Sequence, residues 1–204
     1  MSDGARGLAV ITRGLPEYEC LQGADGELTL AVTLLRCVEW LSRGDLSTRR
    51  GHAGPAIYTP GAQCPGTHVF EYAVAPHAGT WLEAGLPAAA VSYAGPPLAY
   101  VASGQAGHRP AGGQASLLAL AAGSPAVTVT AVKKAEEGEG LVVRMYNAAE
   151  SPRIARLEAG FNLASATSAT LDETPGEALA VTGGRAIEVP VGPKGIVTVV
   201  LFRA

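Results

Sequence analysis

The chain has 204 residues with a formal net charge of −3, and 48% of them are hydrophobic, 16% charged and 5% aromatic, a mixture that excludes a disordered chain. No cluster of basic residues is longer than Arg49-Arg50 or Lys133-Lys134, so nucleic acid is not an expected partner. No apolar run reaches the ~18–20 residues of a membrane span and the N-terminus lacks a signal-peptide pattern, so we expect a cytoplasmic protein without a membrane partner.

Alternating apolar residues predict strands in the first part of the chain. Residues 27–36 place four apolar side chains on one face, residues 67–75 alternate in the same way, and a shorter strand is expected over 8–12. Residues 78–84 and 87–93 are expected as short helical turns separated by Gly85, because proline is tolerated only at a helix start.

The second half is predicted to be β structure. Residues 126–132 and 141–147 flank a charged loop and indicate a hairpin, with Leu141, Val143 and Met145 pointing inward. Strands are also expected over 187–191 and 196–202, around a Gly-Pro-Lys-Gly turn. Short strands at this spacing favour an antiparallel β-sandwich.

A long loop over residues 43–66 has neither helical nor strand periodicity. Loops of this length inside compact domains are usually functional or disordered, and we expect an ordered one because Ile57, Tyr58 and Cys64 offer apolar groups to bury. The loop also holds the densest polar cluster of the chain, which consists of Arg43, Asp45, Arg49, Arg50, His52 and Gln63. An equally weighted alternative is a solvated loop held together by pairs between Asp45 and arginine.

Motifs of catalysis and metal binding are missing from the sequence. There is no His-x-Asp, His-Glu-x-x-His, Cys-x-x-Cys, Gly-x-Ser-x-Gly or phosphate-binding glycine loop, so neither a catalytic residue nor a metal ligand is expected in this chain. The cysteines Cys20, Cys37 and Cys64 match no metal spacing and are expected to be free, half-buried thiols.

Several ordered motifs resemble the C-terminal β region of glycoside hydrolase family 38, the α-mannosidases, and its bacterial members above all. The matching segments are Gly7-Leu8-Ala9-Val10, Gly14-Leu15-Pro16-Glu17-Tyr18-Glu19, Thr33-Leu34-Leu35-Arg36, Trp40-Leu41-Ser42-Arg43, Arg49, Gly51-His52-Ala53-Gly54-Pro55, Thr59-Pro60-Gly61-Ala62-Gln63-Cys64, Ala131-Val132-Lys133-Lys134, Gly138-Glu139-Gly140-Leu141, Arg144, Tyr146-Asn147 and Gly195-Ile196-Val197-Thr198. The resemblance covers most of the chain and is weak only over residues 95–114.

The resemblance implies a mainly β fold with one short helical segment, over residues 78–93. A portion of a galactose-mutarotase-like supersandwich over residues 1–101 would carry the long loop. A crossover over 102–114 would lead to a smaller immunoglobulin-like β-sandwich section over 115–204.

The resemblance also implies that this chain is a non-catalytic part of a zinc-dependent, retaining α-mannosidase. In that family, zinc and both catalytic carboxylates lie in a β/α barrel, which is absent from this sequence. The expected partners are such a barrel, on the same or a neighbouring polypeptide, and a mannose-containing carbohydrate. No cofactor is expected in the chain itself, and association into homo-oligomers is left open.

An arginine of the long loop reaches the substrate pocket in that family. Arg49 is the residue that we match to it, with Arg50 as second candidate because a one-residue gap would shift the register. A guanidinium offers a fixed fork of donors to sugar hydroxyls or to an acidic group. His52 and Gln63 are weaker candidates that we expect to hold the loop. Trp40 and Trp81 could stack on a sugar ring, but packing against protein is the favoured interpretation.

A rival hypothesis from another functional class is a free-standing carbohydrate- or protein-binding β-sandwich module without enzymatic activity. An accessory domain of some other α-glycosidase would differ only in its substrate. The composition of the loop does not separate these alternatives.

Overall fold

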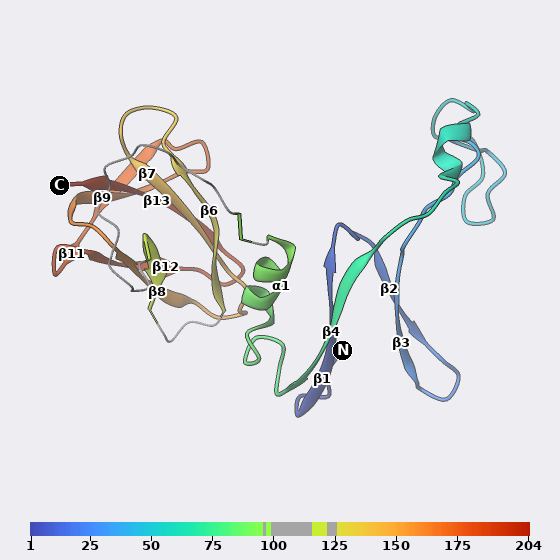
Figure 1. The fold of residues 1–204 in the computed structure, drawn as a ribbon, viewed down its shortest axis with the longest axis horizontal. Helices are drawn as coiled ribbons and strands as arrows, with labels where there is room; N and C mark the ends of the chain where they lie inside the picture. The colour runs from blue at the N-terminus through green and yellow to red at the C-terminus, as the bar shows by residue number, and fades with distance from the viewer. Residues whose placement is uncertain (96, 99–115, 122–125) are drawn as a thin grey trace. The chain divides into compact units, whose positions relative to one another are not determined.

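The computed structural model describes residues 1–95, 97–98, 116–121 and 126–204, and it is mainly antiparallel β structure with a single α-helix in this part of the chain (Figure 1). The expected fold class is therefore confirmed. The chain divides into two compact units, one of Met1 with Val10–Ala75 and one of Ser2–Ala9 with Pro76–Ala204. The predicted crossover over 102–114 lies outside the described residues, and the predicted domain limits stay a prediction.

Two antiparallel sheets form the C-terminal β-sandwich. The larger sheet has the strand order β10-β9-β13-β7-β6, with β6 (Val127–Lys134), β7 (Leu141–Asn147), β9 (Leu163–Ala169), β10 (Pro175–Leu179) and β13 (Ile196–Arg203). The smaller sheet has the order β11-β12-β8-β5, with β5 (Leu118–Leu120), β8 (Arg153–Ala159), β11 (Val181–Thr182) and β12 (Ala186–Val191).

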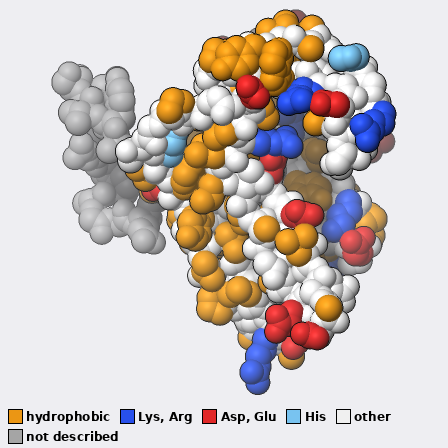
Figure 2. Space-filling model, turned by 90° about the vertical axis from the view of Figure 1, so that its right-hand side faces the viewer, with side chains coloured by type: hydrophobic (Ala, Val, Ile, Leu, Met, Phe, Trp, Pro, Cys, Tyr) orange, Lys and Arg blue, Asp and Glu red, His pale blue; other side chains and the backbone are white. Residues whose placement is uncertain are grey.

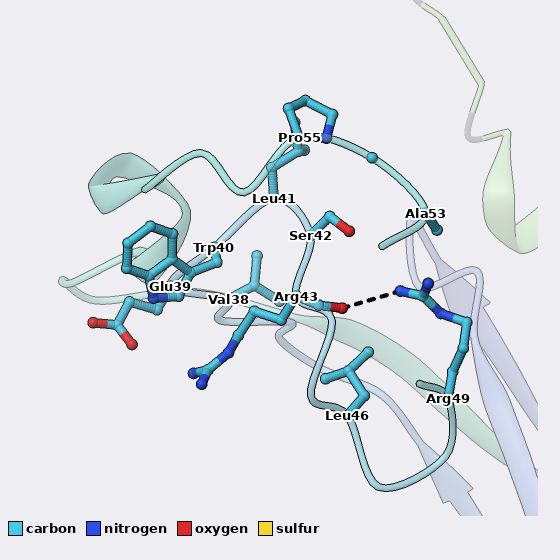
Figure 3. A pocket seen from close by; sticks show the side chains of 11 residues that line it. Val38, Glu39, Trp40, Leu41, Ser42, Arg43, Leu46, Arg49, Ala53 and Pro55 are labelled. Atoms are coloured by element: carbon cyan, nitrogen blue, oxygen red, sulfur yellow. Dashed lines mark hydrogen bonds between the residues drawn. The ribbon is translucent and has the colours of Figure 1, made fainter. Parts of the chain in front are cut away.

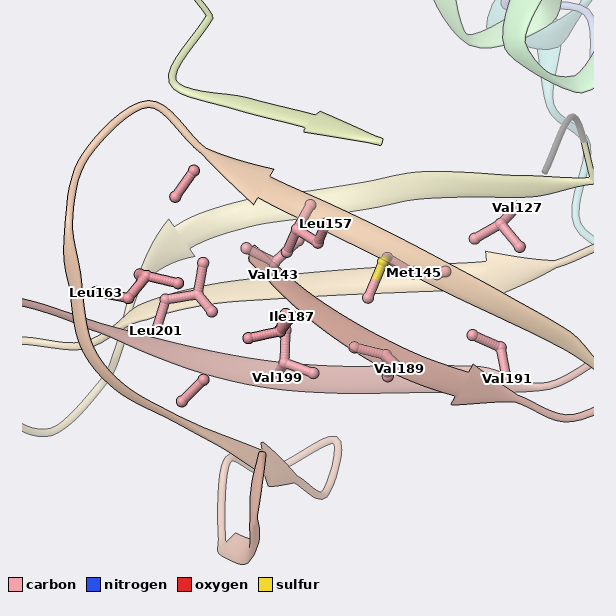
Figure 4. Close-up of a cluster of buried hydrophobic side chains, with 13 residues drawn as sticks. Val127, Val143, Met145, Leu157, Leu163, Ile187, Val189, Val191, Val199 and Leu201 are labelled. Atoms are coloured by element: carbon pink, nitrogen blue, oxygen red, sulfur yellow. The ribbon is translucent and has the colours of Figure 1, made fainter. Parts of the chain in front are cut away.

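The core of the sandwich lies between the inner faces of these sheets (Figure 4). Val143 and Met145 on β7 are fully buried and Leu141 packs against the same cluster, as the alternation of this strand predicts. Ile187 and Val189 on β12 meet them from the smaller sheet. Burial of one such side chain contributes about 1.5–3 kcal/mol, so the core supplies most of the stability of this unit.

Strands β8, β9 and β10 have no individual counterpart among the predicted strands. The inward positions of β8 and β9 include the small residues Ala155, Ala159 and Ala166, which are nearly fully buried, and no residue of β10 is buried. Alanine gives little hydrophobic contrast, so these strands are decided by their neighbours in the sheet rather than by their own pattern.

Asn147, at the end of β7, is a fully buried polar residue. Its Nδ2 group donates to the carbonyl oxygens of Ser151 (2.9 Å), Val191 (3.2 Å) and Gly192 (2.9 Å), and its Oδ1 accepts from the Ala149 N–H at 2.9 Å. One side chain thus joins the ends of β7 and β12 to the loop before β8.

The N-terminal elements form two separate two-stranded sheets. In one, β1 (Arg6–Arg13) pairs with β4 (Glu71–Ala78), and in the other β2 (Tyr18–Gln22) pairs with β3 (Leu28–Val32). The strand predicted over 27–36 is observed as β3 and ends at Val32. The strand predicted over 67–75 is observed as β4, which begins at Glu71 and ends at Ala78. A proline inside β4 is tolerated because this strand has only one neighbour.

The helical segment follows β4. The Ala84 N–H donates to the Thr80 carbonyl oxygen at 3.0 Å, and α1 (Leu86–Ala94) begins after Gly85, whose φ of +67° suits glycine. The expected break at Gly85 between two helical turns is confirmed. Within the described residues, no helix combines the length and hydropathy required to cross a membrane.

Burial differs sharply along the chain. Every described residue up to position 98 is exposed or only half-buried, whereas the sandwich contains all the buried side chains. Large apolar side chains are exposed on the two-stranded sheets, among them Tyr18 (72%), Leu28 (58%) and Tyr72 (56%), and many hydrophobic groups reach the surface drawn in Figure 2. Two-stranded sheets are marginally stable in water without a covering layer.

We expect Asn147→Ala to lower the free energy of unfolding of the chain by about 2–4 kcal/mol, because it leaves three carbonyl oxygens and one N–H without their partner. Denaturant unfolding measures this change. Asn162→Ala is the matched control, since Asn162 is exposed and accepts a single hydrogen bond, from Arg185, and it should cost less than about 1 kcal/mol. Equal losses for both variants would contradict the role of Asn147.

The isolated chain should associate through its exposed apolar strands, as seen by size-exclusion chromatography and by binding of a hydrophobic dye. Leu28→Lys should weaken both signals. Leu171→Lys is the control, because Leu171 has a similar exposed fraction (62% against 58%) but lies in the turn between β9 and β10. A monomer that binds no dye would contradict the prediction.

Candidate functional site

The segment between β3 and β4 is an ordered loop whose two arms are joined through the backbone. The Leu41 N–H donates to the Ile57 carbonyl oxygen and the Thr59 N–H to that of Glu39, each at 2.8 Å. The rings of Trp40 and Tyr58 lie between the same arms with centroids 5.5 Å apart. These contacts fix the position of Trp40.

The source of order in this loop differs from the prediction. Ile57 and Tyr58 are 51% and 53% exposed, so they bury little, and only Cys64 is half-buried. Backbone hydrogen bonds, together with the 3-10 helix η1 (Pro60–Gln63), supply the order instead. Cys20 and Cys37 are exposed rather than half-buried, and all three cysteines are free thiols.

A tight turn carries the arginines of the loop. The Gly51 N–H donates to the Gly44 carbonyl oxygen at 2.9 Å, and Asp45 and Arg50 form an isolated antiparallel bridge. The ring of His52 packs on Gly44 so closely that a Cβ at Gly44 would lie 3.0 Å from the imidazole. His52 therefore helps to close the turn.

Arg43 and Asp45 form a two-pronged ion pair, with Nε–Oδ1 and Nη2–Oδ2 distances of 2.9 and 2.7 Å. The hydrogen bond from Arg43 holds the pKa of the Asp45 carboxyl below its ordinary value, and the carboxylate in turn raises the pKa of Arg43. This is the internal pairing of the alternative interpretation, and it involves Arg43 rather than Arg49 or Arg50.

Arg49 lies at one end of a cavity of about 590 Å³ (Figure 3). Its Nη1 donates to the Gly51 carbonyl oxygen at 2.8 Å and its Nη2 to that of Arg43 at 3.3 Å. The cavity is lined mainly by apolar groups, and its residues are Val38, Glu39, Trp40, Leu41, Ser42, Arg43, Leu46, Arg49, Ala53, Gly54 and Pro55. The guanidinium is thus held at the edge of a largely apolar surface.

A second cavity of about 380 Å³ shares Trp40 and Arg43 with the first and is lined also by Asp45 and His52. Arg49 and His52 therefore each line one of two cavities with common walls. Arg50 and Gln63 line neither, and Gln63 is the last residue of η1.

Sequence reasoning missed the apolar walls of this site. Trp40, which packs against Tyr58 as we expected, also lines both cavities, and Leu46 and Pro55 contribute to the larger one. No pattern could reveal these residues, because the loop has no periodicity and its arms meet through backbone contacts between residues 16 and 20 positions apart.

Ser42 Oγ, in the wall of the larger cavity, is buried and has no hydrogen-bond partner among the described residues. A buried hydroxyl without a partner costs about 1–3 kcal/mol, so the polar groups of this loop are not fully satisfied in the chain alone. Nowhere in the described residues do three His, Cys, Asp or Glu side chains come close enough to hold a metal ion, so these residues do not fit a zinc site.

Comparisons with known proteins agree with the motifs of the sequence. Residues 126–199 match the model of the glycosyl hydrolases family 38 C-terminal beta sandwich domain. The chain is 30% identical to an α-mannosidase from Enterococcus faecalis V583 of solved structure, with a TM-score of 0.70 over 100% of this chain and 20% of that one. A second E. faecalis structure, of a protein in glycosyl hydrolase family 38, is 29% identical with a TM-score of 0.70, over 100% of this chain and 21% of that one.

A protein of Halalkalibacterium halodurans, provisionally named mannosylglycerate hydrolase, is 28% identical over 198 residues, which are 97% of this chain and 20% of that protein. The chain thus spans about one fifth of the length of these relatives. The resemblance is confirmed: residues 126–199 match the C-terminal sandwich domain of family 38, and the whole chain is similar to a part of family 38 proteins.

The Arg43–Asp45 pair predicts the pH response of the loop. Because the pKa of Asp45 is lowered in the fold, its pairing energy is present above pH 3.8 and is lost as the pH falls through the lower folded value. A carboxyl NMR titration should give Asp45 a midpoint below 3.8, and Arg43→Gln should raise it. A midpoint that does not move on Arg43→Gln would contradict the pairing.

Proposed function

We propose that this chain, as a C-terminal part of a glycosyl hydrolase family 38 enzyme, completes a retaining enzyme that hydrolyses α-mannosidic bonds and places Arg49 at its sugar site. The similarity of the whole chain to one fifth of an α-mannosidase supports this proposal. The relatives hold this region within a much longer chain, so a catalytic region is its natural partner.

The chemical step is assigned to that partner. Hydrolysis with retention needs two carboxyl groups about 5–5.5 Å apart across the glycosidic bond, and the family resemblance places them, with zinc, in the β/α barrel. The role of this chain is then to bind and orient the sugar, while cleavage occurs on the other part.

Arg49 is the residue of this chain that best suits contact with sugar. Two backbone carbonyl groups hold its guanidinium, so its orientation is fixed before a ligand arrives. Trp40 lies in the same cavity and offers an apolar face to the C–H groups of a sugar ring. A fixed donor fork and an aromatic side chain on opposite sides of one cavity (Figure 3) are the observation that carries the proposal.

The other candidates have smaller roles in this proposal. Arg50 follows Arg49 directly but lines neither cavity, His52 closes the turn over Gly44, and Gln63 ends η1. The three free cysteines suit a reducing compartment, which supports a cytoplasmic location.

The purified chain should not release nitrophenol from an aryl α-mannoside, with or without added zinc. Assembled with its catalytic region, the chain should support turnover, and Arg49→Ala should lower kcat/KM by about 10–100-fold, the loss of a hydrogen bond to a charged group. Arg153→Ala is the control, because this exposed arginine of β8 donates only to the adjacent Pro152 carbonyl oxygen.

Zinc-stimulated turnover by the chain alone would contradict the proposal that the catalytic groups lie in another region. Unchanged kcat/KM for Arg49→Ala would favour the free-standing binding module, since the loop would then lie away from the reacting sugar.

A further inference from the structure

We propose that the turn between β9 and β10, residues 170–174, is a strap across the outer face of the larger sheet, and that Glu173 holds this strap closed. Glu173 does so by binding Lys133 on β6, the strand at the far edge of the same sheet. The inference concerns the C-terminal sandwich alone and does not depend on the function proposed for the loop between β3 and β4.

The first observation is that the outer face of the larger sheet is buried at its centre. On the paired strands β7 and β13, Val143 and Val199 point into the core, so the alternating residues Val142, Thr198 and Val200 point outwards. These three are nevertheless only 0%, 2% and 6% exposed. The smaller sheet lies on the opposite side, so another part of the chain covers this face.

The second observation is where the strap makes its contacts. Arg144 on β7 donates from Nε to Thr198 Oγ1 at 3.2 Å and from Nη2 to the Leu171 carbonyl oxygen at 2.9 Å. Further along the strap, Glu173 Oε1 lies 2.7 Å from Lys133 Nζ on β6. Since the strand order is β10-β9-β13-β7-β6, the strap leaves β9 and reaches past β13 and β7 to the opposite edge.

The third observation is that the Glu173 carboxylate is enclosed at this contact. Its side chain is 11% exposed, and its Oε2 accepts a hydrogen bond from the Glu136 N–H at 2.8 Å. By contrast, the carboxylate that pairs with the adjacent Lys134 belongs to Glu139, whose side chain is 90% exposed. An ion pair shielded from water is stronger than an exposed one, and loss of Lys133 would leave an enclosed charge without its counter-ion.

The fourth observation is the backbone conformation of Glu173. Its φ of +69° lies in the left-handed region, which glycine adopts freely and which is disfavoured for a residue with a side chain. Within the strap, the Glu173 N–H donates to the Thr170 carbonyl oxygen and the Thr170 N–H to that of Thr174, each at 3.1 Å. The contact of the carboxylate offsets the conformational cost at this position.

Amide hydrogen exchange of the full chain, read residue by residue, tests the proposal. The Glu136 amide reports the contact with Glu173, the Thr170 amide reports the turn of the strap, and the Ala135 amide, which donates to the Gly140 carbonyl oxygen within the hairpin, is the internal reference. Glu173→Gln should raise the exchange rates of Glu136 and Thr170 by about 10-fold, and that of Ala135 by less than about 2-fold.

The matched pair of variants is Lys133→Met and Lys134→Met, which remove the same charge from adjacent residues of β6. Lys133→Met should raise the exchange rates of the Glu136 and Thr170 amides by about 3–10-fold. Lys134→Met should change them by less than about 2-fold, because its partner Glu139 lies in the same hairpin and is exposed. Equal effects of the two variants, or none for Lys133→Met, would overturn the proposal.

Glu173→Gly separates the side chain from the backbone. Glycine suits a φ of +69°, so a strap held by its backbone alone should open less often in this variant, and the Thr170 amide should exchange more slowly than in the wild type. We expect exchange about 10-fold faster instead. Slower or unchanged exchange would overturn the role of the carboxylate.

Circular dichroism establishes that each variant is folded. If neither variant of Glu173 folds, Lys133→Met carries the test, since it leaves the strap sequence intact. Faster exchange at Thr170 in that variant supports the proposal, and an unchanged rate overturns it.

Discussion

The uneven distribution of apolar burial is the constraint on which the other features of this chain depend. The two sheets of the C-terminal sandwich bury a continuous core around Met145, Leu157 and Ile187. The N-terminal sheets have two strands each, and none of their described residues is buried. The C-terminal sandwich therefore has a core that can stabilise it, while the N-terminal sheets are suited to packing against another protein surface.

This constraint explains how the loop between β3 and β4 is built. Without a core beneath it, the loop is ordered by backbone hydrogen bonds between its arms, by the contact of Trp40 with Tyr58 and by the pair between Arg43 and Asp45. Exposed ion pairs contribute little to stability, so their main effect is to orient side chains. The outcome is one arginine neutralised within the loop and a second that is fixed but not neutralised.

The chain combines a self-sufficient sandwich with an exposed loop that carries polar groups. The chain spans about one fifth of the length of its relatives, and the names of two of them refer to mannosides. Under the proposed function, a catalytic region would both cover the apolar strands and enclose the cavity beside Arg49. Stability and substrate recognition would then depend on the same contact surface.

The sequence by itself determined the fold class and the clearest elements of the sandwich. The hairpin of β6 and β7 and the strands β12 and β13 follow from large alternating apolar residues, whose burial on one face leaves a single arrangement of the strand. The motifs of the loop also indicated the family, and the loop was correctly expected to be ordered.

Only the tertiary structure decided the rest. Strands β8 and β9 depend on pairing with neighbours, since their buried alanines give little hydrophobic contrast. Arg49 and Arg50 are equivalent in sequence, but only Arg49 lines the cavity, because the turn closed by Gly44 and Gly51 directs adjacent side chains differently. Contacts between residues far apart in the chain set these features, and no local pattern encodes them.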